Sequence, residues 1–215
     1  MIKFLLCLFV FIIIPSSCLA GVSVVGTRFF IDDSTKALNV KVLNDGESDY
    51  LVKTKVNNDG FIISPPLFIL PKNKSNIITI IPDEKIKANK DGVYSLTITT
   101  IPKSEVNPNN NVVSLAIRSH FNLIYKHGAP TEKDYNEMTL TRSQVGKWSL
   151  VNPTNFAFMV LLSNRFYHHS GGAKLLGPGQ SISVDEHCSK DSCSLWLSIF
   201  GDESYVVKKL HLVHG

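Results

Sequence analysis

Residues 111–125, NVVSLAIRSHFNLIY, are typical of one long β-strand in which apolar side chains occupy alternate positions. One face of this strand is apolar except at Ser119, and it carries Val113, Leu115, Ile117, Phe121, Leu123 and Tyr125. Strands usually contain about five or six residues. So long a strand raises the question of whether all these side chains are buried in their own domain or whether some contact another protein. Periodicity alone favours the domain core.

The same alternation continues on both sides of this stretch, while helical periodicity is nearly absent. Before it we predict strands over residues 37–43, 50–56, 61–70, 76–81 and 93–101. The segment 61–70, FIISPPLFIL, contains two prolines, which indicate an edge strand or a strand that passes between sheets. With the N-terminal segment this makes about seven strands before residue 127, as is typical of a β-sandwich.

A second β-sandwich is predicted after residue 127. Gly128 and Pro130, within KHGAPTEKD (126–134), indicate a connection between domains. Strands are predicted beyond it over residues 148–152, 156–162, 173–177, 181–184, 194–200 and 205–213. We therefore expect an all-β protein with an N-terminal domain at 21–127 and a C-terminal domain at 128–215.

Residues 1–20 have the pattern of a secretory signal peptide, because Lys3 precedes the apolar stretch 4–15 and the small residue Ala20 precedes the expected cleavage site. The apolar stretch is short for a membrane span. Cleavage would leave 195 residues (215 − 20) and lower the formal net charge from +4 to +3, since Lys3 is the only charged residue lost. The chain has no dense basic stripe and no nucleic-acid motif, so we expect export and no nucleic-acid partner.

The exported chain keeps Cys188 and Cys193, in the stretch HCSKDSCS. Two neighbouring cysteines in an exported protein predict a disulfide across a tight hairpin. The alternative is a metal site that also uses His168, His169 and His187, but zinc needs convergent ligands and nothing in the spacing demands convergence. We therefore expect a disulfide and no metal.

An enzyme is not indicated by the sequence. It contains no GxSxG elbow, no HExxH pair and no phosphate-binding glycine loop, and its seven histidines are scattered. With both cysteines oxidised, no free thiol remains as a nucleophile. We expect no catalytic residues, no cofactor and no small-molecule substrate.

Several segments carry motifs that occur together in one family. GVSVVGTRFFID (21–32) contains a Thr-Arg pair, ISPPLFILPKNKSNIITI (63–80) a Pro-Pro-x-Phe segment, and IPKSE (101–105) an Ile-Pro strand ending. SLAIRSHFNLIYKHG (114–128), LVNPT (150–154) and LLGPGQSISV (175–184) follow in order. Together they resemble the PapD-like periplasmic pilus-assembly chaperones of the chaperone–usher pathway. The resemblance implies two immunoglobulin-like β-sandwich domains in an angled, boomerang-like arrangement around a cleft.

The resemblance also implies a use for the long strand. In this family the chaperone lends its seventh strand to a pilus subunit whose own sandwich lacks its last strand, which is a form of β-strand addition. Val113, Leu115 and Ile117 would then fill the groove of the subunit.

Family members also hold the C-terminal carboxylate of the subunit with an Arg from the first strand and a Lys from the seventh. Arg28 matches the Arg, whereas Asn122 stands where the family has the Lys. Asparagine donates hydrogen bonds but carries no charge, so we expect a weaker anchor, with His120 on the same face as a candidate substitute. The alternative interpretation of Asn122 at this position is that this family member has a changed chaperone role.

Two further expectations follow from the resemblance. Asp91, Lys126 and Asp202 match a charged network between the domains. The short loop 103–111, flanked by strands without cysteine, resembles the short F1–G1 loop branch, which serves rod-like pili with tip adhesins.

We therefore expect a periplasmic chaperone of a Gram-negative bacterium that binds, folds and caps pilus subunits and delivers them to an outer-membrane usher. Self-association of the free chaperone stays open. So do two alternative functions. One is a fimbrial structural subunit or adhesin, which would need its own N-terminal donor extension and would lack a seventh strand. The other is a periplasmic metal-binding β-sandwich protein.

Overall fold

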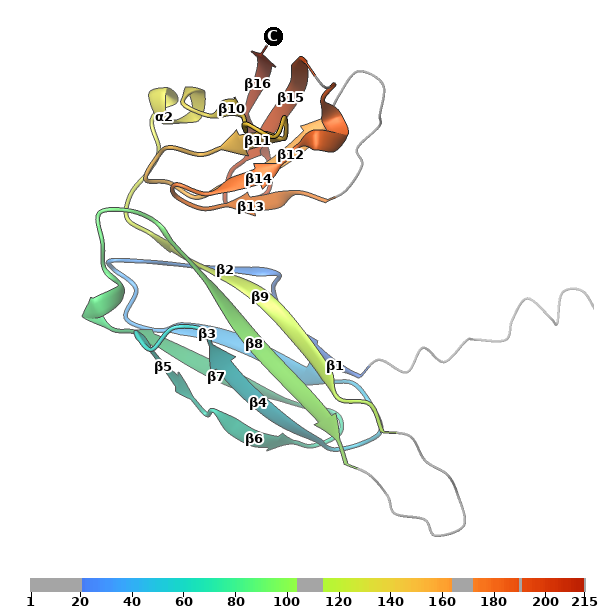
Figure 1. The fold of residues 1–215 in the computed structure, drawn as a ribbon. Coiled ribbons are helices and arrows are strands. Elements are labelled where there is room, and N and C mark those ends of the chain that lie inside the picture. The colour runs from blue at the N-terminus through green and yellow to red at the C-terminus, as the bar shows by residue number, and fades with distance from the viewer. Residues whose placement is uncertain (1–20, 104–113, 164–171, 190, 215) are drawn as a thin grey trace, which may run out of the picture.

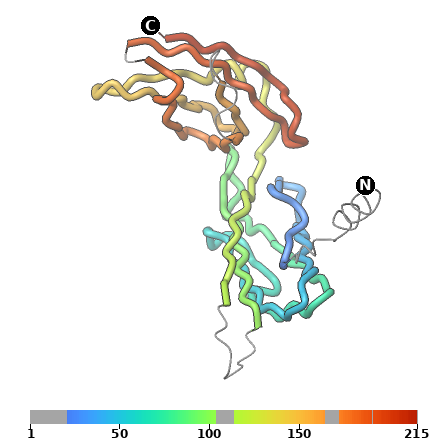
Figure 2. Tube along the Cα trace, turned by 90° about the vertical axis from the view of Figure 1, so that its right-hand side faces the viewer, coloured from blue at the N-terminus to red at the C-terminus, as the bar shows by residue number. Residues whose placement is uncertain are grey.

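The computed structural model describes residues 21–103, 114–163, 172–189 and 191–214. Nearly all the regular structure in these ranges is β, and it forms two sandwich domains set at an angle (Figures 1 and 2). The predicted all-β class is therefore confirmed. No helix in the described ranges is long and apolar enough to cross a membrane.

The N-terminal domain packs a four-stranded sheet against a five-stranded sheet. The first sheet has the order β1 (Val22–Val24), β3 (Leu38–Asn44), β7 (Lys74–Pro82), β5 (Phe61–Ser64). The second has the order β2 (Arg28–Asp32), β9 (Ile117–Lys126), β8 (Gly92–Pro102), β4 (Tyr50–Val56), β6 (Leu67–Leu70), and the short helix η1 (Glu84–Ile86) precedes β8. Alternate side chains of each strand, such as Val40, Ile78, Leu96 and Leu123, are buried between the sheets.

Two segments predicted as continuous strands each contribute to both sheets. The N-terminal segment changes sheet around Gly26, where φ is +117° and a Cβ would lie 2.9 Å from the Phe29 ring, so only glycine fits. The segment 61–70 changes sheet at Pro65 and Pro66, since β5 pairs with β7 while β6 pairs with β4. The two prolines thus mark a strand that passes between sheets, one of the two predicted readings.

The long strand predicted at 111–125 is shorter in the structure. β9 begins at Ile117, and Ser114 to Ala116 are outside it, while Val113 lies outside the described residues. The last pair between β8 and β9 joins Thr100 to Ile117, although β8 itself continues to Pro102. Residues 114–116 continue the alternation of the sequence but are not part of β9.

The C-terminal domain packs a three-stranded sheet against a four-stranded sheet. The first has the order β10 (Thr139–Arg142), β11 (Trp148–Val151), β14 (Ser181–Ser183). The second has the order β13 (Lys174–Leu176), β12 (Phe158–Ser163), β15 (Cys193–Phe200), β16 (Val206–His214), and the short helix η2 (Asp185–His187) precedes β15.

Sequence reasoning missed two elements at the start of this domain. α2 (Glu132–Asn136) is one short turn of helix whose N-terminus is capped by Asp134, which accepts a hydrogen bond from the Thr131 backbone N–H at 2.6 Å. β10 was missed because only Leu140 of its four side chains is buried, which leaves no alternation to detect.

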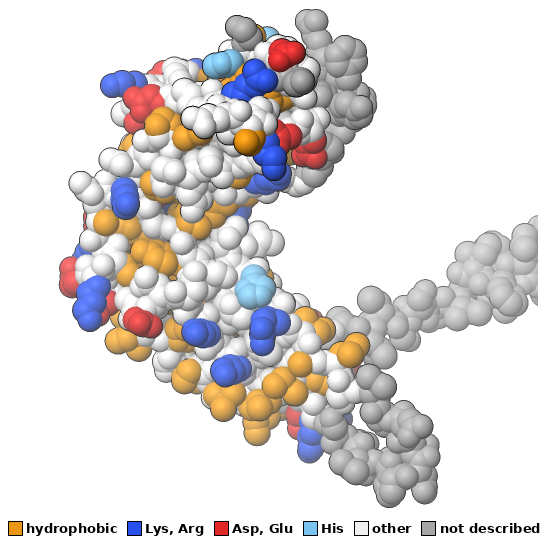
Figure 3. All heavy atoms as spheres, viewed as in Figure 1, with side chains coloured by type: hydrophobic (Ala, Val, Ile, Leu, Met, Phe, Trp, Pro, Cys, Tyr) orange, Lys and Arg blue, Asp and Glu red, His pale blue; other side chains and the backbone are white. Residues whose placement is uncertain are grey.

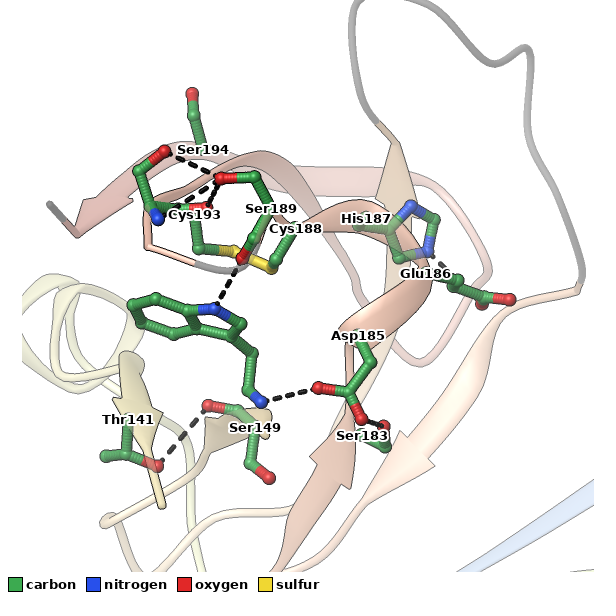
Figure 4. Close-up of a disulfide and its surroundings, with 12 residues drawn as sticks. Thr141, Ser149, Ser183, Asp185, Glu186, His187, Cys188, Ser189, Cys193 and Ser194 are labelled. Carbon is green, nitrogen blue, oxygen red and sulfur yellow. Dashed lines mark hydrogen bonds and ion pairs between the residues drawn. A yellow bond between two sulfur atoms is a disulfide. The ribbon is translucent and has the colours of Figure 1, made fainter. Parts of the chain in front are cut away.

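The predicted disulfide between Cys188 and Cys193 is confirmed, and Figure 4 shows it beside Ser189 and His187. The indole N–H of the buried Trp148 donates to the Ser189 carbonyl at 2.9 Å, which fixes the hairpin on the core. Among the described residues, no three His, Cys, Asp or Glu side chains are grouped so as to hold a metal ion. His168 and His169 lie outside the described residues.

Candidate functional site

The apolar face of β9 is divided into a buried and an exposed part. Leu123 and Tyr125 are buried in the core of the N-terminal domain, and Phe121 packs against it. Ile117, on the same face, is 59% exposed, and Leu115, just before the strand, is 72% exposed. The domain-core interpretation of Leu115 and Ile117 is therefore wrong. Their side chains are available to another protein.

The edge of β9 next to these residues is also open. On one side β9 pairs with β8 from Ile117 to Tyr125. On the other side β2 pairs with it in parallel, but only from Asn122 onward. In the described chain, the backbone from Ile117 to Phe121 thus has a ladder partner on one side only. An open edge with exposed branched side chains is a template for an additional strand.

Arg28 and Asn122 face each other at the end of this open edge. They are the first pair of the β2–β9 ladder, and both side chains are half-buried. The Arg28 guanidinium donates from Nη2 to the hydroxyl of Ser204, which belongs to the C-terminal domain. An arginine next to an asparagine amide can bind a carboxylate through charge-assisted hydrogen bonds.

His120 is directed away from Arg28. Its Nδ1 lies 3.1 Å from Thr97 Oγ1, and Thr97 is its cross-strand neighbour on β8, opposite the side where β2 lies. The structure therefore brings Arg28 and Asn122 together but places the His120 ring over the neighbouring strand.

A cavity of about 310 Å³ lies in the cleft between the domains, which Figure 3 shows as a hollow. Phe30 and Ile124 line it from the N-terminal domain, and Phe158, Met159 and Phe200 from the C-terminal domain. Phe30 and Ile124 pair with each other two residues beyond Arg28 and Asn122, on the same face. The Arg28–Asn122 pair therefore lies beside the cleft cavity.

Asp91 forms a polar link between the domains. Its fully buried carboxylate accepts from the backbone N–H of Ala157 in the C-terminal domain at 2.9 Å and from that of His127 at 3.0 Å. Its Oδ2 lies 3.3 Å from Lys126 Nζ, which in turn lies 3.7 Å from Asp202. Lys126 thus stands between Asp91 and Asp202.

The LVNPT segment positions the C-terminal side of this link. The buried Asn152 accepts from the Thr154 backbone N–H at 3.1 Å and donates to the Phe156 carbonyl at 2.7 Å. This turn presents the Ala157 N–H to Asp91 and stacks Phe156 on His127, with ring centroids 4.7 Å apart.

Tyr125 holds the cleft end of β9 in place. Its hydroxyl donates to Asp33 Oδ1 at 2.7 Å. Burial, followed by the hydrogen bond to Asp33, raises the pKa of Tyr125 to about 12. The phenol therefore stays neutral and remains a donor throughout the physiological pH range.

Sequence reasoning did not find Ser204, His127 or Ala157. The contacts of Ser204 and Ala157 join residues from different domains, and the contact between His127 and Asp91 spans 36 residues. Local spacing carries no signal of such contacts. Only His127 could have been suspected from the sequence, because it follows Lys126, a residue of the expected charged network between the domains.

The Asp91→Asn variant is expected to lower the free energy of unfolding by about 3 kcal/mol. Lys126 loses its buried, negatively charged partner, and the new amide NH₂ faces a backbone N–H, which is also a donor. Circular dichroism during urea unfolding measures this loss. Asp202→Asn is the matched control, because that carboxylate is 55% exposed and its loss should cost at most about 1 kcal/mol. Equal losses from both variants would contradict the assigned role of Asp91.

Comparison with known proteins gives consistent matches. Residues 21–129 match the family described as "Pili and flagellar-assembly chaperone, PapD N-terminal domain". The chaperone protein LpfB of Salmonella typhimurium is 27% identical over 168 residues, which cover 73% of this chain and 71% of that one. The probable fimbrial chaperone LpfB of Escherichia coli O157:H7 is 30% identical over 148 residues, 63% of each chain.

Solved structures show the same fold. The periplasmic chaperone SfaE aligns over 90% of this chain and 100% of its own, with a TM-score of 0.68 and 21% identity. The structure of the Salmonella enterica SafA pilin in complex with the SafB chaperone aligns over 91% of this chain and 97% of that one, with a TM-score of 0.73 and 18% identity.

Proposed function

Because the chain belongs to the PapD-like family of pilus- and flagellar-assembly chaperones, we propose that it lends β9 to pilus subunits in the periplasm and delivers them to an outer-membrane usher. The single observation that carries this proposal is the exposure of Leu115 and Ile117 beside the open edge of β9. A subunit that lacks its last strand would pair with this edge and cover both side chains.

The energy of this association comes from apolar burial and backbone pairing. Burying each of Leu115 and Ile117 contributes about 1.5–3 kcal/mol. The backbone of Ile117 to Phe121 supplies ladder hydrogen bonds that set the register of the added strand. The same contacts keep the open groove of the subunit from pairing with other chains.

The second element of the proposed site is the anchor for the C-terminal carboxylate of the subunit. Arg28 supplies the positive charge and Asn122 an amide donor. Because Asn122 carries no charge, Arg28 supplies the electrostatic part of the anchor on its own. Residues 104–113, which include Val113, lie outside the described residues, so Val113 stays a prediction for the donor segment.

The known relatives support a chaperone rather than a pilus subunit, an adhesin or a metal-binding sandwich. The SafB structure was solved with a pilin bound, which supports pilus subunits as the partners here. The proposed action is purely associative. It needs neither a nucleotide nor a metal.

Co-expression with candidate pilus subunits in the periplasm of a host that lacks its own fimbrial chaperones tests the proposal. We expect a subunit that is degraded or insoluble alone to be recovered as a soluble complex with this chain. Solubility of all candidate subunits without the chaperone, or no complex with any of them, would contradict it.

A further inference from the structure

We propose that the C-terminal domain completes the carboxylate anchor through Ser204, which positions the Arg28 guanidinium and donates its own hydroxyl hydrogen to the subunit carboxylate. This inference rests on the proposed function, because it assigns a third group to the same anchor. It makes subunit recognition dependent on both domains.

The contact itself is the first support. Ser204 Oγ accepts a hydrogen bond from Arg28 Nη2 across the cleft. A guanidinium has five N–H donors, so four remain for a bidentate carboxylate. A hydroxyl that accepts one hydrogen bond still has its own hydrogen to donate. Ser204 is exposed, so this hydrogen can be donated to a bound carboxylate.

The backbone of Ser204 is the second support. Its φ of +67° lies in the left-handed region, where glycine is favoured and serine is uncommon. The turn that imposes this conformation is tight, because the Ser204 N–H donates to the Gly201 carbonyl at 3.0 Å and the Gly201 N–H to the Tyr205 carbonyl at 2.9 Å. A serine at a backbone position that suits glycine is an outlier that supports a role for its hydroxyl.

The same turn is tied to the N-terminal domain by a second contact. Asp202, two residues before Ser204, lies 3.7 Å from Lys126 at the end of β9. Two contacts from one turn fix its distance from β2 and β9, and so fix where Ser204 meets Arg28. The angle between the domains therefore sets the geometry of the anchor.

The test measures affinity for the subunit recovered by co-expression, in its natural form and with three residues added at its C-terminus, which moves the carboxylate away. Ser204→Gly should lower affinity for the natural subunit roughly fivefold. Its thermal midpoint should stay unchanged or rise, since glycine suits the backbone. Ser204→Asn, which tolerates this backbone and keeps an acceptor and a donor, should restore most of the affinity.

Two comparisons separate this role from general damage. Ser204→Gly should have no effect on the extended subunit, and it should add nothing to Arg28→Ala in the double variant. If Arg28→Ala weakens binding and Ser204→Gly does not, the inference is overturned while the proposed function stands. If Arg28→Ala itself has no effect, the proposed anchor fails, and the role of Ser204 fails with it.

Discussion

The Arg28→Ala variant is expected to lose stable complexes with pilus subunits while its own fold is retained. Arg28 is the only charged member of the proposed anchor, and charge-assisted hydrogen bonds of this kind contribute about 1.5–3 kcal/mol. Its loss should lower affinity roughly 10- to 100-fold. Recovery of complex after periplasmic co-expression, followed by titration of the purified proteins, measures this change.

Two control variants define what the loss means. Arg28→Lys keeps the charge but not the planar fork, so it should recover only part of the affinity. Arg142→Ala removes an arginine of the C-terminal domain that contacts Asp191 and the Trp148 ring, so it should leave subunit binding unchanged. A normal yield of complex from Arg28→Ala would remove the carboxylate anchor from the mechanism.

Ile117→Glu and Leu115→Glu should each abolish recovery of soluble subunit complexes. Either change would place a carboxylate in an apolar groove, where burial of an unpaired charge costs several kcal/mol. Both side chains are largely exposed in the free chain, so its own stability should change by at most about 0.5 kcal/mol. Pull-down of co-expressed subunit and thermal unfolding of the free variants measure the two effects.

Ile62→Glu is the matched control for this pair. Ile62 lies on β5 in the other sheet of the same domain and is 62% exposed, against 59% for Ile117. Both variants thus replace a similarly exposed isoleucine with glutamate, but Ile62 is remote from the open edge of β9. Loss of complex in Ile62→Glu as well would show that any added charge disturbs binding, and the role of β9 would lose its support.

A chaperone that works in this way must keep an unpaired strand edge without aggregating. The structure limits the risk by making the open part of β9 short, from Ile117 to Phe121. Arg118 lies within it, exposed, and charged residues on edge strands discourage pairing between identical chains.

The strands and their faces could be predicted from the sequence because a side-chain period of two is a local property. The alternation of Val40 and Val42 in the strand predicted over 37–43 indicated a face that is buried in the structure. The disulfide was equally accessible, since two cysteines so close in an exported chain leave few alternatives. The short elements α2 and β10 were missed because they contain too few residues to show such a periodic pattern.

The sequence by itself therefore determined two β-sandwiches, the face of each long strand and the presence of an arginine at the start of β2. Only the tertiary structure decided that the apolar face of β9 is buried at Leu123 and exposed at Ile117. Periodicity says which way a side chain points, whereas burial depends on which other strands lie beside and over it, and β2 pairs with β9 only from Asn122 onward. It likewise decided that Ser204 meets Arg28 and that Ala157 meets Asp91, because such contacts arise from the packing of two domains rather than from neighbouring residues.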